Sequence, residues 1–215
     1  MTLLIHLLRH GTTLWNQEGR FQGSSNVELN DAGWQQARAL ALCLASAPLA
    51  AVFASDLARA VCTARLVAEP HGLAVQTDRG LQELNQGDME GKTRDYLTAN
   101  YPGLLERWRA DAASIRMPGG ETMGELQERT WAAIQRIHAK HSDGEVAVVA
   151  HNLANCMILC KVADVPIKDF SQFHQEPGCH NTVELNGSVG RVLVVNDSSH
   201  LTQYDCDHPE GYGGR

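Results

Sequence analysis

Short apolar runs alternate along this chain with segments whose apolar residues recur every three or four positions. The runs are typical of buried strands and the segments of amphipathic helices. Their alternation favours a three-layer α/β/α fold with a mostly parallel central sheet. Strands are expected at 3–8, 51–54, 74–77 and 145–150, and helices from 31 to 44, from 57 to 68 with Ser55 or Asp56 as cap, from the Thr122/Glu125 capping box to 137, and at 153–162.

The remaining segments complete the expected domain organisation. Residues 182–185 and 191–195 predict a hairpin of late strands around Asn186-Gly187. Proline and glycine delimit residues 91–120, which predict short helices lying over one end of the sheet. We therefore expect a single domain over residues 1–196, with 91–120 inserted as a helical cap. The polar stretch 197–215 is expected to be a partly mobile tail.

Composition narrows the choice of partners and compartment. The chain has 215 residues, is 43% hydrophobic and carries a net charge of -7, as ordinary soluble domains do. This acidic balance argues against nucleic-acid and anionic-membrane partners. The first apolar run stops at Arg9 and lacks the features of a signal peptide, so we expect a cytoplasmic protein. The six cysteines are then expected to be reduced, most of them in the core.

Polar residues suited to binding an anion follow three of the predicted strands. Arg9 and His10 end the first strand, Arg59 follows the second, and His151 follows the strand at 145–150. The carboxyl ends of strands in an open α/β sheet converge on one crevice. Guanidinium groups match the geometry of phosphate, and a neutral imidazole can act as a nucleophile. The sequence therefore predicts a phosphate site at this end of the sheet.

Five blocks of residues follow one another along the chain. The first contains Arg9-His10-Gly11, Asn16, Gly19 to Gly23 and Leu29 to Gly33, and the other four are Ser55 to Ala60, Glu83 to Lys92, Pro118 to Glu121 and Val149 to His151. Together they resemble the histidine phosphatase superfamily, in its phosphoglycerate-mutase-like branch, over residues 3 to about 165. Five blocks in the family's order are far more specific than Arg-His-Gly alone.

The resemblance implies a metal-free, cofactor-free phosphoryl transfer in two steps. His10 would attack phosphorus and become phosphorylated, while Arg9, Arg59 and His151 would hold the phosphoryl oxygens. Glu83 would protonate the leaving oxygen and later take a proton from water, although Asp88 and Glu90 are nearby carboxylates that could also reach the site. The residues expected to complete the phosphate and substrate pocket are Asn16, Gln22, Gly23 and Asn152.

Two residues depart from the family pattern. Thr12 stands where glutamate or glutamine is usual, and Asn152 stands where glycine is usual. Asparagine tolerates unusual backbone angles, so we expect the turn after His151 to survive. The departures imply either reduced activity or altered specificity.

The expected activity is that of a histidine acid-type phosphatase acting on a small phosphate ester. Phosphoglycerate mutases of the family generally have a longer middle insertion with an arginine pair, which residues 91–120 lack. A mutase is therefore the second hypothesis, and a catalytically weak relative that binds phosphate compounds or a protein is the third. The late strands or the tail offer an edge through which a homodimer could form.

Overall fold

A computed structural model describes residues 1–187 and 189–204, with side chains described up to residue 201. Its six-stranded sheet has the order β3-β2-β4-β1-β5-β6. β1 to β4 are parallel, β5 runs antiparallel to β1, and β6 runs antiparallel to β5. The strands are β1 (Leu3–Arg9), β2 (Leu49–Ala54), β3 (Val75–Thr77), β4 (Gly144–Ala150), β5 (His180–Asn186) and β6 (Val189–Asp197).

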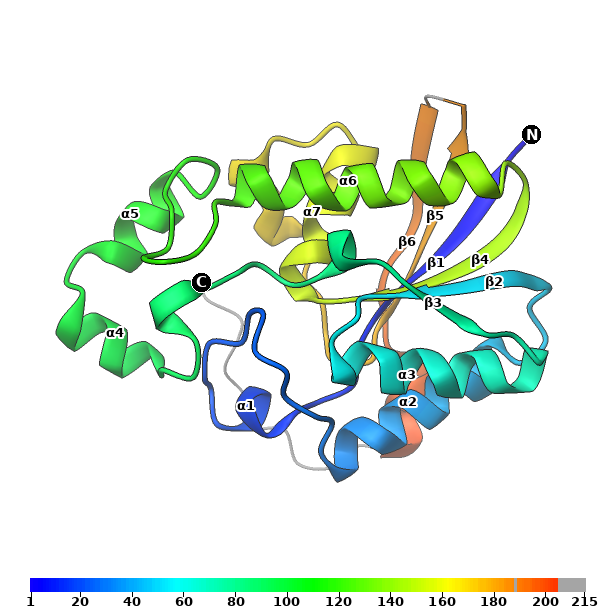
Figure 1. The fold of residues 1–215 in the computed structure, drawn as a ribbon, viewed down its shortest axis with the longest axis horizontal. Coiled ribbons are helices and arrows are strands. Elements are labelled where there is room, and N and C mark those ends of the chain that lie inside the picture. Colours follow the sequence, from blue (N-terminus) through cyan, green and yellow to red (C-terminus); the bar gives the residue numbers. More distant parts are fainter. Residues whose placement is uncertain (188, 205–215) are drawn as a thin grey trace.

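Helices cover both faces of this sheet, which confirms the expected three-layer α/β/α fold (Figure 1). α6 and α7 pack on one face over Ile5, Val146 and Val148, and α2 and α3 pack on the other over Leu8 and Val149. The helices are α1 (Leu14–Gln17), α2 (Asp31–Leu44), α3 (Ala58–Ala68), α4 (Arg94–Asn100), α5 (Leu104–Ala110), α6 (Met123–Lys140) and α7 (Asn152–Val162), with 3₁₀ turns η1 (Glu69–His71), η2 (Arg79–Leu81), η3 (Gly87–Met89), η4 (Ile167–Gln172) and η5 (Ser199–Tyr204).

The segment 91–120 contains the short helices α4 and α5, which extend beyond one end of the sheet (Figure 1). Most of its buried side chains belong to a small hydrophobic cluster, while Ala112 belongs to the core that lines the sheet and Trp108 packs against both. This cluster comprises Met89, Leu97, Leu104 and Met117, with Phe21, Tyr101, Leu105, Trp108 and Ile115 packed against it.

The predicted helix starts are only partly right. The capping box at Thr122 and Glu125 is confirmed, because each side chain bonds to the other's backbone at the start of α6. The cap proposed for α3 is wrong: Leu57 is its N-cap residue, and it makes no side-chain capping bond. Ser55 Oγ instead accepts from the Leu57 backbone N–H at 3.3 Å, one step before the helix begins.

The chain from Asp197 onward is expected to be a partly mobile tail, and the structure shows its first residues packed against the domain. η5 lies against α2, and the His200 ring contacts the Gly178 carbonyl oxygen at 2.9 Å. Residues 205–215, the rest of the predicted tail, lie outside the described residues.

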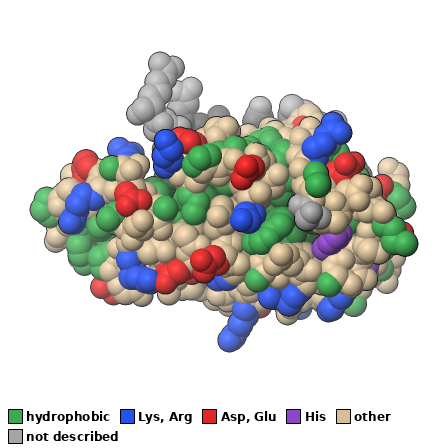
Figure 2. Space-filling view, turned by 90° about the horizontal axis from the view of Figure 1, so that it is seen from above, with side chains coloured by type: hydrophobic (Ala, Val, Ile, Leu, Met, Phe, Trp, Pro, Cys, Tyr) green, Lys and Arg blue, Asp and Glu red, His purple; other side chains and the backbone are tan. Residues whose placement is uncertain are grey.

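The surface and the helices add two observations. On the face seen in Figure 2, cationic and anionic side chains are interspersed instead of gathering into a single basic area. Among residues 1–187 and 189–204, none of the helices combines the length and the apolar character needed to cross a membrane.

Candidate active site

The predicted site residues lie at or just after the carboxyl ends of three neighbouring strands. Arg9 is the last residue of β1, and His10 follows it. His151 follows β4 as the N-cap of α7, and Arg59 lies in the first turn of α3, just beyond β2. Because β2, β4 and β1 are adjacent in the sheet, residues separated by up to 142 positions meet in one buried cluster. Strand order explains this convergence.

The surroundings of His10 fix the position of its proton. Its Nδ1 lies 2.7 Å from the Gly11 carbonyl oxygen, which can only accept a hydrogen bond, so Nδ1 carries the hydrogen. Nε2 therefore keeps its lone pair. Burial, followed by the charges of Arg59 and Arg9, holds the pKa of His10 well below its usual value. The ring is thus a neutral imidazole with a nucleophilic Nε2.

Arg59 joins His10 to His151. Its guanidinium is fully buried, and its Nε donates to His10 Nε2 and to His151 Nδ1, each at 3.2 Å. Burial lowers the pKa of Arg59 to about 10, which still leaves it charged at neutral pH. The two imidazole rings lie 5.0 Å apart between centroids, at an interplanar angle of 63°. A cation therefore lies directly between two neutral imidazoles.

Two buried donors in this cluster have no partner among the described residues. Since His151 Nδ1 accepts from Arg59, the proton of His151 lies on Nε2, and this atom is one of the two. Arg9 Nε is the other, while Arg9 Nη1 donates to the Gln175 carbonyl oxygen. Buried donors are rarely left unpaired because the desolvation cost is about 1–3 kcal/mol each. Unpaired N–H groups beside two arginines suit an anion with several oxygens, such as a phosphoryl group.

Glu83 provides a buried carboxyl group near Arg59 and Arg9. Its Oε1 accepts from the backbone N–H groups of Leu84 at 2.8 Å and Ala154 at 3.2 Å, and Oε2 accepts from Leu153 N–H at 3.1 Å. The last two groups belong to the first turn of α7. Burial raises the pKa of Glu83 despite these bonds and the nearby charges of Arg59 and Arg9. A raised pKa suits a group that has to give up a proton and later accept one.

The other two carboxylates that the sequence left open have different surroundings. Asp88 is exposed on η3. The Glu90 carboxylate accepts hydrogen bonds from the backbone N–H and hydroxyl groups of Ser24 and Ser25. Neither arrangement resembles the buried position of Glu83 beside the arginines.

The four predicted pocket residues differ in the contacts they make. Asn16 Oδ1 accepts from the backbone and hydroxyl of Thr13 at 3.0 Å, which caps α1. Gln22 Oε1 lies 2.7 Å from the oxygen of the same hydroxyl. Gly23 touches the cluster directly, since its carbonyl accepts from Arg59 Nη2 at 2.7 Å. Asn152 is the first residue of α7, adjacent to His151.

The two departures from the family pattern are accommodated in this fold. Thr12 is buried, and both its backbone N–H and its hydroxyl donate to Gln36 Oε1 of α2, at 2.8 and 3.0 Å. Asn152 is the first helical residue of α7, and its φ is not positive, since Asp164 and Asn196 are the non-glycine residues with positive φ in the described part of the chain. The turn after His151 is thus kept, as expected, and it needs no unusual backbone angle at Asn152.

Sequence reasoning missed the carbonyl groups that hold Arg59. Arg59 Nη1 donates to the Ser25 carbonyl at 2.7 Å, alongside the bond from Nη2 to Gly23. Backbone acceptors leave no mark in the residue pattern. The neighbouring Gly23 gave the available hint, because a Cβ there would overlap the Glu90 carboxylate and the Leu84 carbonyl.

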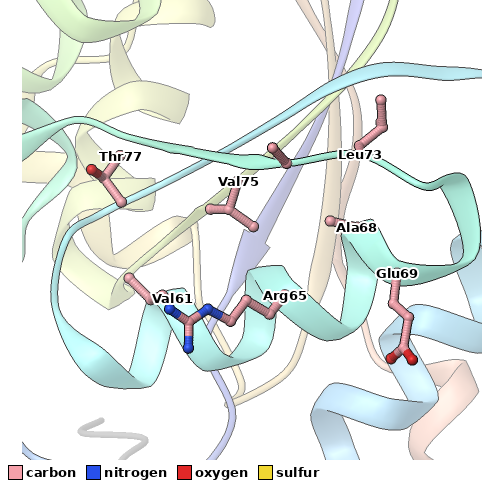
Figure 3. A pocket seen from close by; sticks show the side chains of 8 residues that line it. Val61, Arg65, Ala68, Glu69, Leu73, Val75 and Thr77 are labelled. Atoms are coloured by element: carbon pink, nitrogen blue, oxygen red, sulfur yellow. The ribbon is translucent and has the colours of Figure 1, made fainter.

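A surface cavity of about 330 Å³ lies elsewhere, between α3 and β3 at the edge of the sheet (Figure 3). Val61 and Arg65 line it from α3, Glu69 lines it from η1, and Val75 and Thr77 line it from β3. None of the predicted site residues belongs to this lining. The cavity is therefore not the candidate active site.

Comparison with known proteins defines the class. The histidine phosphatase superfamily (branch 1) matches residues 5–198, and the chain belongs to this family. Among curated relatives, phosphoglycerate mutase-like protein 4 of Arabidopsis thaliana is 39% identical over 68% of this chain and 65% of its own length. Phosphoserine phosphatase 1 of Hydrogenobacter thermophilus is 25% identical over 92% of this chain and 94% of its own. A Yersinia pestis protein named "Probable phosphoglycerate mutase GpmB" is 33% identical over 76% of each chain.

Solved structures agree with this assignment. Bacillus stearothermophilus YhfR has a TM-score of 0.88 and 29% identity, covering 93% of this chain and 99% of its own. A mycobacterial glucosyl-3-phosphoglycerate phosphatase has a TM-score of 0.85 and 28% identity, covering 92% of this chain and all (100%) of its own. The phosphoglycerate-mutase-like fold is thus confirmed, and the family and these relatives support a phosphatase.

Proposed function

We propose that this chain is a metal-independent phosphomonoesterase that hydrolyses a small phosphorylated metabolite through a phosphohistidine on His10. One observation carries the proposal: a neutral, nucleophilic Nε2 on His10 lies in a buried cluster with the unpartnered donors His151 Nε2 and Arg9 Nε. Such a cluster combines a nucleophile with preformed stabilisation of negative charge, which is what phosphoryl transfer requires.

In the first step His10 Nε2 forms a bond to phosphorus as the bond from phosphorus to the ester oxygen breaks. Arg9, Arg59 and His151 donate hydrogen bonds to the phosphoryl oxygens. The carboxyl group of Glu83 gives its proton to the leaving oxygen, and an alcohol departs. The imidazole becomes positively charged, and the Gly11 carbonyl that accepts from Nδ1–H stabilises that charge.

In the second step a water molecule attacks the phosphohistidine. The Glu83 carboxylate takes a proton from this water, the bond between nitrogen and phosphorus breaks, and neutral His10 and inorganic phosphate result. Glu83 is thereby restored to its protonated form. Asn16, Gln22, Gly23 and Asn152 are proposed to line the pocket around the phosphate and the rest of the ester.

The test is release of inorganic phosphate from p-nitrophenyl phosphate in the presence of EDTA. We expect turnover by the wild-type chain and none by His10→Ala. The control is His138→Ala, in the last turn of α6 and outside the site, which is expected to keep full activity. Loss of turnover in EDTA that is restored by added divalent metal would contradict the metal-independent mechanism.

A mutase is the second candidate, because several relatives carry a phosphoglycerate mutase name. Conversion of 3-phosphoglycerate to 2-phosphoglycerate that depends on a bisphosphate primer, without net phosphate release, would favour it over the phosphatase. If the chain neither forms a phosphoenzyme nor turns over any ester, the third hypothesis remains, namely a relative that only binds phosphate compounds or a protein.

A further inference from the structure

Arg59 is held in place by the loop at residues 23–25. Its Nη1 and Nη2 each donate one hydrogen bond to a carbonyl of this loop, Ser25 and Gly23, both at 2.7 Å. A guanidinium has five N–H groups. Nε–H is shared by the two imidazoles and the carbonyls take two more, so two N–H groups remain for a phosphoryl oxygen. The direction of those two groups depends on where the loop carbonyls lie.

Glu90 in turn holds this loop. Its Oε1 accepts from the backbone N–H of Ser24 at 2.7 Å and from the Ser24 hydroxyl at 2.9 Å. Its Oε2 accepts from the backbone N–H of Ser25 at 2.7 Å and from the Ser25 hydroxyl. The absence of a side chain at Gly23 lets the carboxylate approach this closely. One carboxylate thus fixes two successive peptide groups.

A single peptide group connects Glu90 to Arg59. The peptide between Gly23 and Ser24 accepts from Arg59 through its carbonyl oxygen and donates to Glu90 through its N–H. Although burial acts in the opposite direction, the hydrogen bonds from Ser25 and Ser24 lower the pKa of Glu90, so it is an anion at neutral pH. An anionic acceptor polarises this peptide and strengthens its carbonyl as the acceptor for Arg59.

Backbone hydrogen bonds next to the Glu90 contact also join the chain before the 23–25 loop to the chain after Glu90. Gly91 N–H donates to the Phe21 carbonyl, and Phe21 N–H donates to the Lys92 carbonyl, both at 2.9 Å. Glu90 therefore lies where the chain around the 23–25 loop contacts the start of the segment 91–120, which contains α4 and α5.

We propose that Glu90 is a positioning residue for Arg59: through the peptides of Ser24 and Ser25 it directs the free N–H groups of Arg59 at the phosphoryl group, without touching substrate. This inference rests on the proposed function. It assigns Glu90 a role different from that of Glu83, which exchanges protons with the reacting oxygens.

The test is Glu90→Gln, which keeps the shape of the side chain but places an NH₂ group against N–H and hydroxyl donors. We expect kcat/KM for p-nitrophenyl phosphate to fall about 10–100-fold, since displacing a catalytic group by about 1 Å can cost about 100-fold. The loss is expected mainly in kcat, because the charge on the phosphoryl oxygens grows in the transition state. Asp88→Asn is the matched control: it removes an exposed carboxylate two residues away and leaves kcat unchanged.

A double-mutant cycle separates positioning from a general loss of stability. In an Arg59→Lys background, Glu90→Gln is expected to cost less than threefold, because the group it positions is already gone. Equal losses in both backgrounds would overturn the proposal, as would wild-type kinetics for Glu90→Gln. If Glu90→Gln does not fold, Ser24→Ala/Ser25→Ala removes the two hydroxyl donors to Glu90 and keeps the three backbone N–H donors of Ser24, Ser25 and Gln86. We then expect a smaller loss in kcat with the same dependence on Arg59.

Binding of inorganic phosphate, measured by calorimetry, keeps this proposal distinct from the proposed function. If the wild-type chain binds phosphate but hydrolyses no ester, the phosphatase proposal fails while the positioning role is still testable. Weaker phosphate binding by Glu90→Gln, with Asp88→Asn unchanged, would then support it. Unchanged phosphate binding together with unchanged turnover would refute it.

Discussion

The proton on each site histidine is fixed by the neighbour that the ring contacts. His10 Nδ1–H donates a hydrogen bond to the Gly11 carbonyl, whereas His151 Nδ1 accepts one from Arg59 Nε–H. The two imidazoles therefore have opposite tautomers. One presents a lone pair and the other presents an N–H, so His10 suits attack on phosphorus and His151 suits binding of a phosphoryl oxygen.

The raised pKa of Glu83 leads to a prediction about leaving groups and pH. Glu83→Gln should lower kcat/KM about 10²–10⁴-fold for an alkyl phosphate such as glycerol phosphate, which needs a proton on its leaving oxygen. The loss should be much smaller for p-nitrophenyl phosphate, whose leaving group departs without one. Steady-state kinetics with both esters, and Glu128→Gln on the exposed face of α6 as the control, measure this difference.

The pH dependence has a definite sign. The first step needs Glu83 protonated and His10 neutral, so kcat/KM for an alkyl phosphate should fall as pH rises through the raised pKa of Glu83. It should also fall at low pH, as His10 takes up a proton at a pKa held below 6.5. Glu83→Gln removes the fall at high pH and keeps the fall at low pH. An unchanged high-pH limb in this variant would contradict the assignment of Glu83 as the acid.

At the scale of elements, the strands and helices position the site through their ends. The carboxyl ends of β1, β2 and β4 place Arg9, Arg59 (in the first turn of α3) and His151 at one end of the sheet. The first turn of α7 donates two backbone N–H groups to Glu83. A carboxylate at a helix N-terminus also interacts favourably with the helix dipole. The charge that Glu83 acquires after giving up its proton is therefore stabilised by the helix.

Thr122 is predicted to affect the stability of α6 and little else. Thr122→Ala removes the side-chain half of the capping box and should lower the free energy of unfolding by about 1 kcal/mol. Thr98→Ala, an exposed position inside α4, should change it by less than about 0.5 kcal/mol. Urea denaturation measures both. A fall in kcat for Thr122→Ala under conditions where the protein stays folded would show that α6 has a further role in the site.

At the scale of the whole molecule, hydrophobic spacing predicted the layers and strand ends predicted which residues meet. The parallel strands, the two helix layers and the convergence of His10, Arg59 and His151 all depend on patterns that are local in sequence. The contact between Glu90 and Ser24 joins positions 66 residues apart, and neither segment has a periodic pattern. The bonds of Thr12 to Gln36 and the start of α3 at Ala58 depend in the same way on packing between elements.

A covalent phosphoenzyme is the central claim for the whole molecule. The chain, mixed with a ³²P-labelled phosphate monoester in EDTA and quenched in denaturant within milliseconds, should carry label in a bond that is stable to base and labile to acid. Peptide mapping should place the label on His10. His10→Ala should carry none, and His138→Ala should be labelled like the wild-type chain. Turnover of the ester without label on His10 would contradict this account.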